Sequence, residues 1–200
     1  MDLLLGLLEP TDGRILIDGA PLAGERLRAW QRTIGYVPQS VFLADDTVRA
    51  NIAFGVPRDE IDDAAVERAA RAAHIHDFIV DDLKQGYHTV VGERGIRLSG
   101  GQRQRLAIAR ALYGDADVIV FDEATSALDT ATESAVMEAI EALHGRKTVI
   151  LIAHRLSSVR TCDTLFLLQD GRLVAQGSLA ELERTSPEFA QLTQPQSAAA

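Results

Sequence analysis

Cysteine is almost absent from this chain, basic residues are in the minority, and no long apolar run occurs. The single cysteine, Cys162, excludes an intramolecular disulfide and a cysteine-rich zinc site. The 20 lysines and arginines are outnumbered by 29 acidic residues, which gives a net charge of −9. Because non-specific nucleic-acid binding needs a basic face, DNA or RNA is not expected as a partner. No apolar run approaches the roughly 18–20 residues that a membrane-spanning helix needs.

The remaining composition is that of a folded globular protein. Of the 200 residues, 46% are hydrophobic and 24% are charged, which excludes disorder over most of the chain. The length predicts one domain, or one domain with a small appendage. The leucine-rich residues 1–8 lack the basic region and the cleavage site of a signal peptide, so they are expected to form the end of a buried helix.

Strands and helices are expected to alternate in the second half of the chain. Periodicity and turn residues predict helices over 59–73, 100–113 and 131–143, strands over 14–18, 34–37, 118–121 and 148–153, and a hairpin of 165–168 with 172–175. This alternation indicates an α/β fold with a mainly parallel sheet. The helix over 100–113 carries Arg103, Arg105 and Arg110, which are expected to make ion pairs. Residues 193–200 have no apolar periodicity and predict a disordered tail.

One candidate site follows the strand Val118–Phe121, which ends in two acids, Asp122 and Glu123. A buried strand of this kind places a carboxylate at the carboxyl edge of a parallel sheet, where α/β proteins bind ligands. In phosphate-transfer enzymes the first acid holds Mg²⁺ and the second can polarise water. By itself, a strand followed by a solvated acidic turn would explain the pattern equally well.

A second candidate site is the segment Leu-Ser-Gly-Gly-Gln at residues 98–102, which begins the helix over 100–113. The two glycines let backbone N–H groups approach an anion closely. The N-terminus of the helix adds the positive end of its dipole, and Ser99 adds a hydroxyl donor. This combination is suited to binding a phosphate group.

Together, these motifs resemble the ATPase domain of ABC transporters. Segments 98–102 and 118–123 match the signature and Walker B motifs of that family. Gln39 matches the Q-loop glutamine, Ser-Ala-Leu-Asp at 126–129 matches the D-loop, and His154 matches the switch histidine. The resemblance covers essentially all of residues 1–190. It implies a P-loop NTPase-like ABC ATPase domain over residues 1–192, with a helical subdomain at about 47–110.

The resemblance implies a role for each matched residue in binding and hydrolysing ATP with Mg²⁺. Asp122 would bind Mg²⁺, and the amide of Gln39 would reach the metal and the attacking water. Glu123 would be the general base, and His154 would donate to the γ-phosphate. The residues expected to contact the nucleotide from the signature and the D-loop are Ser99, Gly100, Gly101, Gln102 and Asp129. Because each ATP would lie between one P-loop and the partner's signature, a second ABC ATPase domain in a head-to-tail dimer is an expected partner.

The P-loop of this family, G-x-x-x-x-G-K-[ST], does not occur in the 200 residues. In the family it is followed directly by a helix like residues 2–8. The chain is therefore expected to begin inside that helix, without the P-loop, the strand before it, or the aromatic residue that stacks on adenine. The missing strand is expected beside the strand that ends at Asp122, and its loss is expected to leave unpaired backbone groups. These 200 residues alone are thus expected to be poorly stable and inactive as an ATPase.

Two segments resemble exporters in particular. Residues 91–95 resemble the exporter loop that senses the transmembrane domain, and residues 51–55 resemble the segment that contacts the coupling helices. The resemblance implies ATP-driven transport by an exporter or flippase. It implies a transmembrane domain as partner, fused upstream, and a place on the cytoplasmic side of the cell membrane. Two alternatives are a non-catalytic ABC subunit that completes a partner's ATP site in trans, and a soluble ABC ATPase outside transport.

Overall fold

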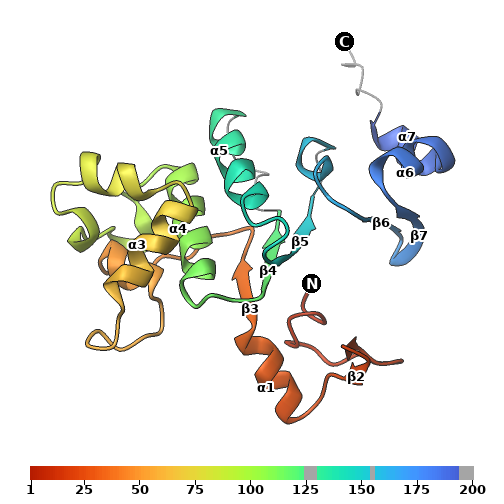
Figure 1. The fold of residues 1–200 in the computed structure, drawn as a ribbon, viewed down its shortest axis with the longest axis horizontal. Helices are drawn as coiled ribbons and strands as arrows, with labels where there is room; N and C mark the ends of the chain where they lie inside the picture. The colour runs from red at the N-terminus through yellow and green to blue at the C-terminus, as the bar shows by residue number, and fades with distance from the viewer. Residues whose placement is uncertain (124–129, 154–155, 194–200) are drawn as a thin grey trace. The chain divides into compact units, whose positions relative to one another are not determined.

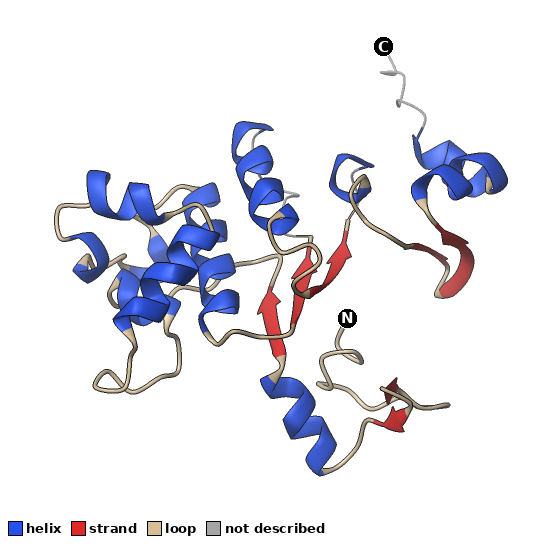
Figure 2. Ribbon diagram, viewed as in Figure 1, coloured by secondary structure: helices blue, strands red, loops and turns tan. Residues whose placement is uncertain are grey.

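The structure, a computed structural model, describes residues 1–123, 130–153 and 156–193. The chain divides into two compact units, Met1–Ile152 and Ala153–Ala200. Figures 1 and 2 show the elements of each unit, and the two units are described separately. Among the described residues, no helix is long and apolar enough to cross a membrane.

The first unit contains five strands, five α-helices and three short helices within the described residues. The strands are β1 (Leu16–Ile17), β2 (Ala20–Pro21), β3 (Ile34–Val37), β4 (Val118–Asp122) and β5 (Thr148–Ile152). The α-helices are α1 (Glu25–Arg32), α2 (Val48–Ile52), α3 (Asp63–Ala72), α4 (Gly100–Tyr113) and α5 (Thr130–Glu141). The short helices are η1 (Phe78–Asp82), η2 (Gly86–His88) and η3 (Glu93–Gly95). The predicted strands over 34–37, 118–121 and 148–153 and the predicted helices over 100–113 and 131–143 are confirmed.

A parallel sheet in the order β3-β4-β5 forms the centre of the first unit. Tyr36 lies opposite Val120 in the register of β3 and β4, and Asp122 lies opposite Ile152 in that of β4 and β5. Side chains alternate between the two faces of a strand, so β4 contributes to two separate apolar clusters. Ile119 and Phe121 belong to the main core, whereas Val118 and Val120 belong to a smaller cluster on the other face.

Helices cover the face of the sheet that carries the main core (Figure 1). Helix α4 packs directly on β3, α2 and α3, and half of its 14 residues are buried. The approach is closest at Gly35, where an added Cβ would lie 2.3 Å from the carbonyl oxygen of Ala111. The side chain of Asp62 caps the N-terminus of α3 by accepting hydrogen bonds from the backbone N–H groups of Ala64 and Ala65. Helices thus occupy most of residues 48–113, while the predicted subdomain and domain boundaries stay predictions.

The other face of the sheet packs against the N-terminal segment, and here one expectation is wrong. Residues 1–8 form turns, not a buried helix end. Leu5 is buried beside Val120, but Leu7 and Leu8 are exposed. The Trp30 indole donates a hydrogen bond to the carbonyl oxygen of Leu4 over 2.7 Å and so holds this segment on α1. The leucines of the segment therefore do not share one buried helical face.

A second correction concerns the edges of β4. The sequence motifs predict a further strand beside the strand that ends at Asp122. In the structure β4 pairs with β3 on one side and with β5 on the other, so both of its edges are occupied. The expected unpaired backbone groups are therefore not found along β4.

A third correction concerns the three arginines of α4, which were expected to make ion pairs. Among the described residues they bond to backbone carbonyl oxygens and form no ion pair with a carboxylate. Arg103 donates to Leu98, and Arg105 donates to His74, both over 2.7 Å. The guanidinium groups of α4 therefore join the helix to loop backbone.

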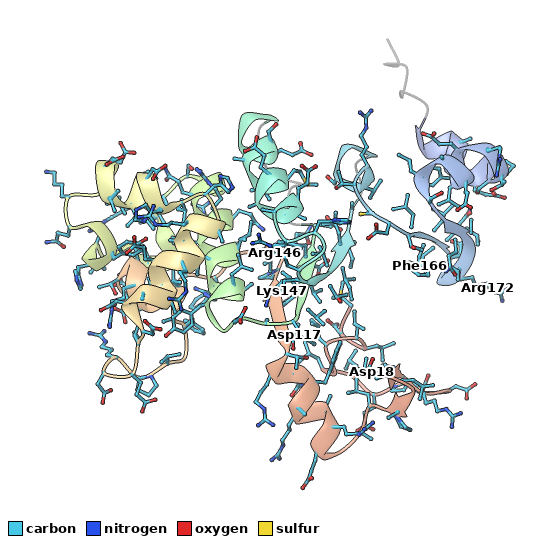
Figure 3. All side chains as sticks on the ribbon, viewed as in Figure 1. Asp18, Asp117, Arg146, Lys147, Phe166 and Arg172 are labelled. Carbon is cyan, nitrogen blue, oxygen red and sulfur yellow. The ribbon has the colours of Figure 1, made fainter. Side chains whose placement is uncertain are left out.

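The second unit contains η4 (Leu156–Val159), β6 (Leu165–Gln169), β7 (Arg172–Gly177), α6 (Leu179–Thr185) and α7 (Pro187–Thr193). Strands β6 and β7 pair antiparallel, which confirms the predicted hairpin. Figure 3 labels Phe166 and Arg172 on the two strands. Leu165, Leu182 and Phe189 form a small core against which Cys162 packs. Burial raises the pKa of the Cys162 thiol. The predicted tail over 193–200 falls almost wholly outside the described residues.

Candidate functional site

The candidate site lies at the carboxyl end of β4. Figure 3 labels Asp117 and Lys147, which directly precede β4 and β5. These two residues mark the amino-terminal ends of the strands, opposite the candidate site. Asp122 is the last residue of β4, and its side chain is half-buried. Glu123 follows in a left-handed conformation with φ 48°, and its backbone N–H donates to the carbonyl oxygen of Ile152. A non-glycine residue at positive φ is uncommon, and such strain clusters at functional sites.

Gln39 and Glu123 meet at this edge although 84 residues separate them. The side-chain amide of Gln39 donates a hydrogen bond from Nε2 to Oε2 of Glu123 over 2.7 Å. Pairing of β3 with β4 makes this contact possible, because Gln39 lies two residues beyond the end of β3. Since the amide nitrogen faces Glu123, the amide oxygen of Gln39 is left to accept a hydrogen bond or to bind a cation.

Tyr36 is a neighbour of the site that no sequence motif identifies. Its hydroxyl donates to Oδ2 of Asp122 over 3.1 Å. Burial, followed by the hydrogen bond to Asp122, raises the pKa of the Tyr36 hydroxyl. The signal lies in the register, because Tyr36 is opposite Val120 and a strand's residues two apart share one face. A long side chain at that position therefore reaches Asp122.

The signature segment forms the N-terminus of α4, a separate element. Ser99 is the N-cap, and its hydroxyl accepts the backbone N–H of Gln102 over 3.2 Å. The side chain of Gln102 accepts the backbone N–H of Ser99 over 2.8 Å, which completes a capping box. Gly100 is exposed and Gly101 is buried, as expected for a helix start that a ligand approaches from one side. This segment offers backbone N–H groups and the positive end of a 14-residue helix.

The structure thus brings Gln39, Asp122 and Glu123 together and places Ser99–Gln102 on α4. Asp129 and His154 lie outside the described residues. Among the residues that the structure describes, no group of three or more histidines, cysteines or acids could hold a metal ion. The Asp122 carboxylate and the Gln39 amide oxygen could supply oxygen ligands to a Mg²⁺ that keeps several waters and binds phosphates.

A family model described as "ABC transporter" matches residues 1–126. The chain belongs to the ABC transporter family. Its fold is that of an ABC ATPase domain, since it aligns with the ATP-bound structure of a bacterial Atm1-family ABC exporter with a TM-score of 0.86. That alignment has 45% sequence identity and covers 96% of this chain and 33% of the other.

Two curated relatives are a flippase and an exporter by name. An ATP-dependent lipid A-core flippase from Cupriavidus metallidurans is 49% identical over 183 residues, which are 91% of this chain and 31% of the relative. An ATM1-type heavy metal exporter from Novosphingobium aromaticivorans is 45% identical over 98% of this chain and 32% of the relative. The chain therefore spans about a third of the length of these ABC proteins.

Proposed function

We propose that this chain is the ATP-hydrolysing part of an ABC exporter, in which ATP hydrolysis powers transport across a membrane. The observation that carries the proposal is the contact of Gln39 with Glu123 directly beside Asp122. The names of the similar proteins, a lipid A-core flippase and a heavy metal exporter, support the export of a substrate.

In the proposed reaction Glu123 is the general base that orients the attacking water. Asp122 and the amide oxygen of Gln39 would hold Mg²⁺, with Tyr36 fixing one oxygen of Asp122. When bound, Mg²⁺ neutralises charge on the transferring phosphate. Gln39 reports on the state of this site, because its amide contacts the base and its segment continues toward the surface. His154 and Asp129 are proposed as further contacts to the γ-phosphate and the nucleotide.

The signature residues are proposed to act on the ATP of a second ABC ATPase domain. Ser99–Gln102 lie at the N-terminus of α4 and present a hydroxyl and backbone N–H groups. These groups are suited to the γ-phosphate of an ATP held by a partner's P-loop. A head-to-tail dimer would place each ATP between two such domains.

A transmembrane domain is the proposed second partner, which would place this domain on the cytoplasmic side of the membrane. Phe42 and Phe54 are both more than half exposed, at 57% and 52%, and their rings pack edge to face 6.5 Å apart. An exposed aromatic pair of this kind favours a protein contact. Phe54 belongs to the segment 51–55 that resembles the coupling-helix contact of exporters.

The experiment compares Mg-ATP binding by the 200-residue chain with binding by the same chain extended at its N-terminus by a P-loop strand. Calorimetry is expected to detect no tight binding to the chain alone, because its sequence contains no P-loop. The extended chain is expected to bind and hydrolyse ATP. Glu123→Gln in the extended chain should keep ATP binding and abolish hydrolysis, because the amide keeps the shape of the side chain but cannot take a proton. Tight binding by the chain alone, or hydrolysis by the Glu123→Gln variant, would contradict the proposal.

A further inference from the structure

Asn51 is a fully buried polar residue of α2 whose side chain is saturated with hydrogen bonds. Its exposed fraction is 0%. Its Oδ1 accepts the backbone N–H of Ala44 over 2.9 Å, and its Nδ2 donates to the carbonyl oxygens of Ala44 and Thr47 over 3.0 and 3.1 Å. Asn51 therefore holds both backbone groups of Ala44, a residue of the loop 39–46 that begins with Gln39.

Arg110, in the last turn of α4, adds a second connection to the same loop. Its Nη1 donates to the carbonyl oxygen of Phe42 over 2.8 Å, and its Nε donates to the carbonyl oxygen of Asn51 over 2.9 Å. Its Nη2 donates to Oδ1 of Asn51 over 3.1 Å. The guanidinium also lies over the Phe54 ring, 4.6 Å from its centroid. One planar side chain thus joins α4, α2 and the loop 39–46.

The hydrogen bonds of Arg110 compensate for the burial of its charged guanidinium. Burial lowers its pKa, and within the described part of the chain it has no carboxylate partner. A buried cation without its hydrogen-bond acceptors is costly, because the charge loses hydration without compensation. Arg110 therefore stabilises the position of the loop in which the carbonyl oxygens of Phe42 and Asn51 can both accept its hydrogen bonds.

We propose that Asn51 and Arg110 are positioning residues that make the loop 39–46 and helix α4 move together. Gln39 and the signature residues Ser99–Gln102 lie at the two ends of this connection, with about 14 Å of rigid helix between Gly101 and Arg110. A push on the exposed Phe42–Phe54 pair then shifts Gln39 and the signature as one body. The functional part of this inference rests on the proposed ATPase function, but the mechanical part does not.

The first test measures backbone hydrogen exchange of the 200-residue chain without nucleotide. Arg110→Lys keeps the charge but cannot bond Phe42 and Asn51 at once, because an ammonium lacks the planar fork of a guanidinium. Exchange in peptides covering 39–46 is expected to rise about tenfold in Arg110→Lys and in Asn51→Ala, since each loses hydrogen bonds to this loop. Arg105→Lys is the matched control, because Arg105 is a half-buried arginine of the same helix whose bond goes to His74. It should raise exchange near His74 and leave 39–46 unchanged.

The second test measures ATP hydrolysis by the extended chain described above. Arg110→Lys and Asn51→Ala are expected to lower kcat about tenfold while KM for ATP stays within about twofold, because the P-loop that grips ATP is untouched. Unchanged exchange over 39–46, or an equal rise in Arg105→Lys, would show that the pair does not hold the loop. If exchange over 39–46 rose but kcat did not change, Asn51 and Arg110 would have only a structural role. That result would overturn the proposal that they are positioning residues. If the extended chain failed to bind ATP, the proposed function would fail while the exchange result stood.

Discussion

The hydroxyl of Tyr36 donates a hydrogen bond to Oδ2 of Asp122 over 3.1 Å and thereby joins β3 to the carboxyl end of β4. Gln39, three residues further along the chain, contacts Glu123, the residue after Asp122. Two consecutive acids are thus each held by a side chain from one short segment. A shift of residues 36–39 would change the orientation of both carboxylates.

Replacement of Tyr36 by phenylalanine is predicted to weaken the use of Mg²⁺. The ring would still pack in the smaller apolar cluster, but Asp122 would lose the donor that fixes one of its oxygens. A hydrogen bond to a charged group contributes about 1.5–3 kcal/mol when buried. Because this pair is half-buried, the Mg²⁺ concentration for half-maximal ATP hydrolysis by the extended chain should rise about threefold to tenfold.

Tyr113→Phe is the matched control for that measurement. The Tyr113 hydroxyl accepts the backbone N–H of Asp62 and is not part of the candidate site. Its loss should leave the Mg²⁺ dependence unchanged. An equal shift in both variants would show that Tyr36 acts only through the stability of the fold.

Ser99→Ala is predicted to lower both stability and ATP hydrolysis. Loss of the N-cap should cost about 1 kcal/mol in the free energy of unfolding, measured by urea titration. Ser178 provides a matched comparison, because it caps α6 with the same capping box, completed by Glu181. Ser178→Ala should cost a similar amount and leave the kcat of the extended chain near the wild-type value. An equal fall of kcat in both variants would contradict a phosphate contact by Ser99.

The secondary structure around the sheet could be predicted from the sequence, because short apolar runs such as Val118–Phe121 are typical of the buried strands of a parallel sheet. The resemblance to the family singled out Gln39 and Glu123 as site residues, but the hydrogen bond between them became known only from the structure. Tyr36 was missed because its importance depends on the register of two strands, which periodicity does not fix. The register became known only from the structure.

The failures have a common physical origin in tertiary contacts. Arg110 looks like a surface charge on a helical projection, yet in the fold its carbonyl partners come from residues far away in sequence. Leucine-rich residues 1–8 look like a helix, but the Trp30 and Gln31 side chains bond to the backbone of this segment and hold it in turns. In both cases the deciding partner is a backbone carbonyl, which no residue pattern identifies.

Gly35→Ala is predicted to destabilise the first unit strongly. The added methyl carbon would lie 2.3 Å from the carbonyl oxygen of Ala111 and 2.8 Å from Cδ1 of Ile119, so α4 would have to move away from β3. Overpacking of a core contact costs about 1–3 kcal/mol, and backbone atoms cannot yield as a side chain can. The measurement is the midpoint of urea unfolding. Gly114→Ala is the control, because nothing lies within 4 Å of a Cβ added at Gly114. The stability of this variant should stay near that of the wild type.

Tyr87 is predicted to make the fold sensitive to strongly alkaline pH. Its hydroxyl lies 2.8 Å from Nδ1 of His76, and burial, with a smaller contribution from the charge of Glu67, raises its pKa to about 12. A raised pKa means that the folded state holds the phenolic proton more tightly than the unfolded state, whose value is near 10. The stability linked to this proton is therefore complete below about pH 10 and is lost as the pH rises through about 12.

The free energy of unfolding is measured between about pH 9 and pH 12, a range that contains the window between the two pKa values. It is paired with a titration of tyrosinate absorbance. Tyr87→Phe should flatten the fall in stability and remove the tyrosinate signal that appears last, while Tyr113→Phe should retain both. The chain has three tyrosines, so three single variants suffice to assign the absorbance steps. If Tyr87→Phe kept the same late-titrating signal, burial of Tyr87 against the main core would not be what holds its proton.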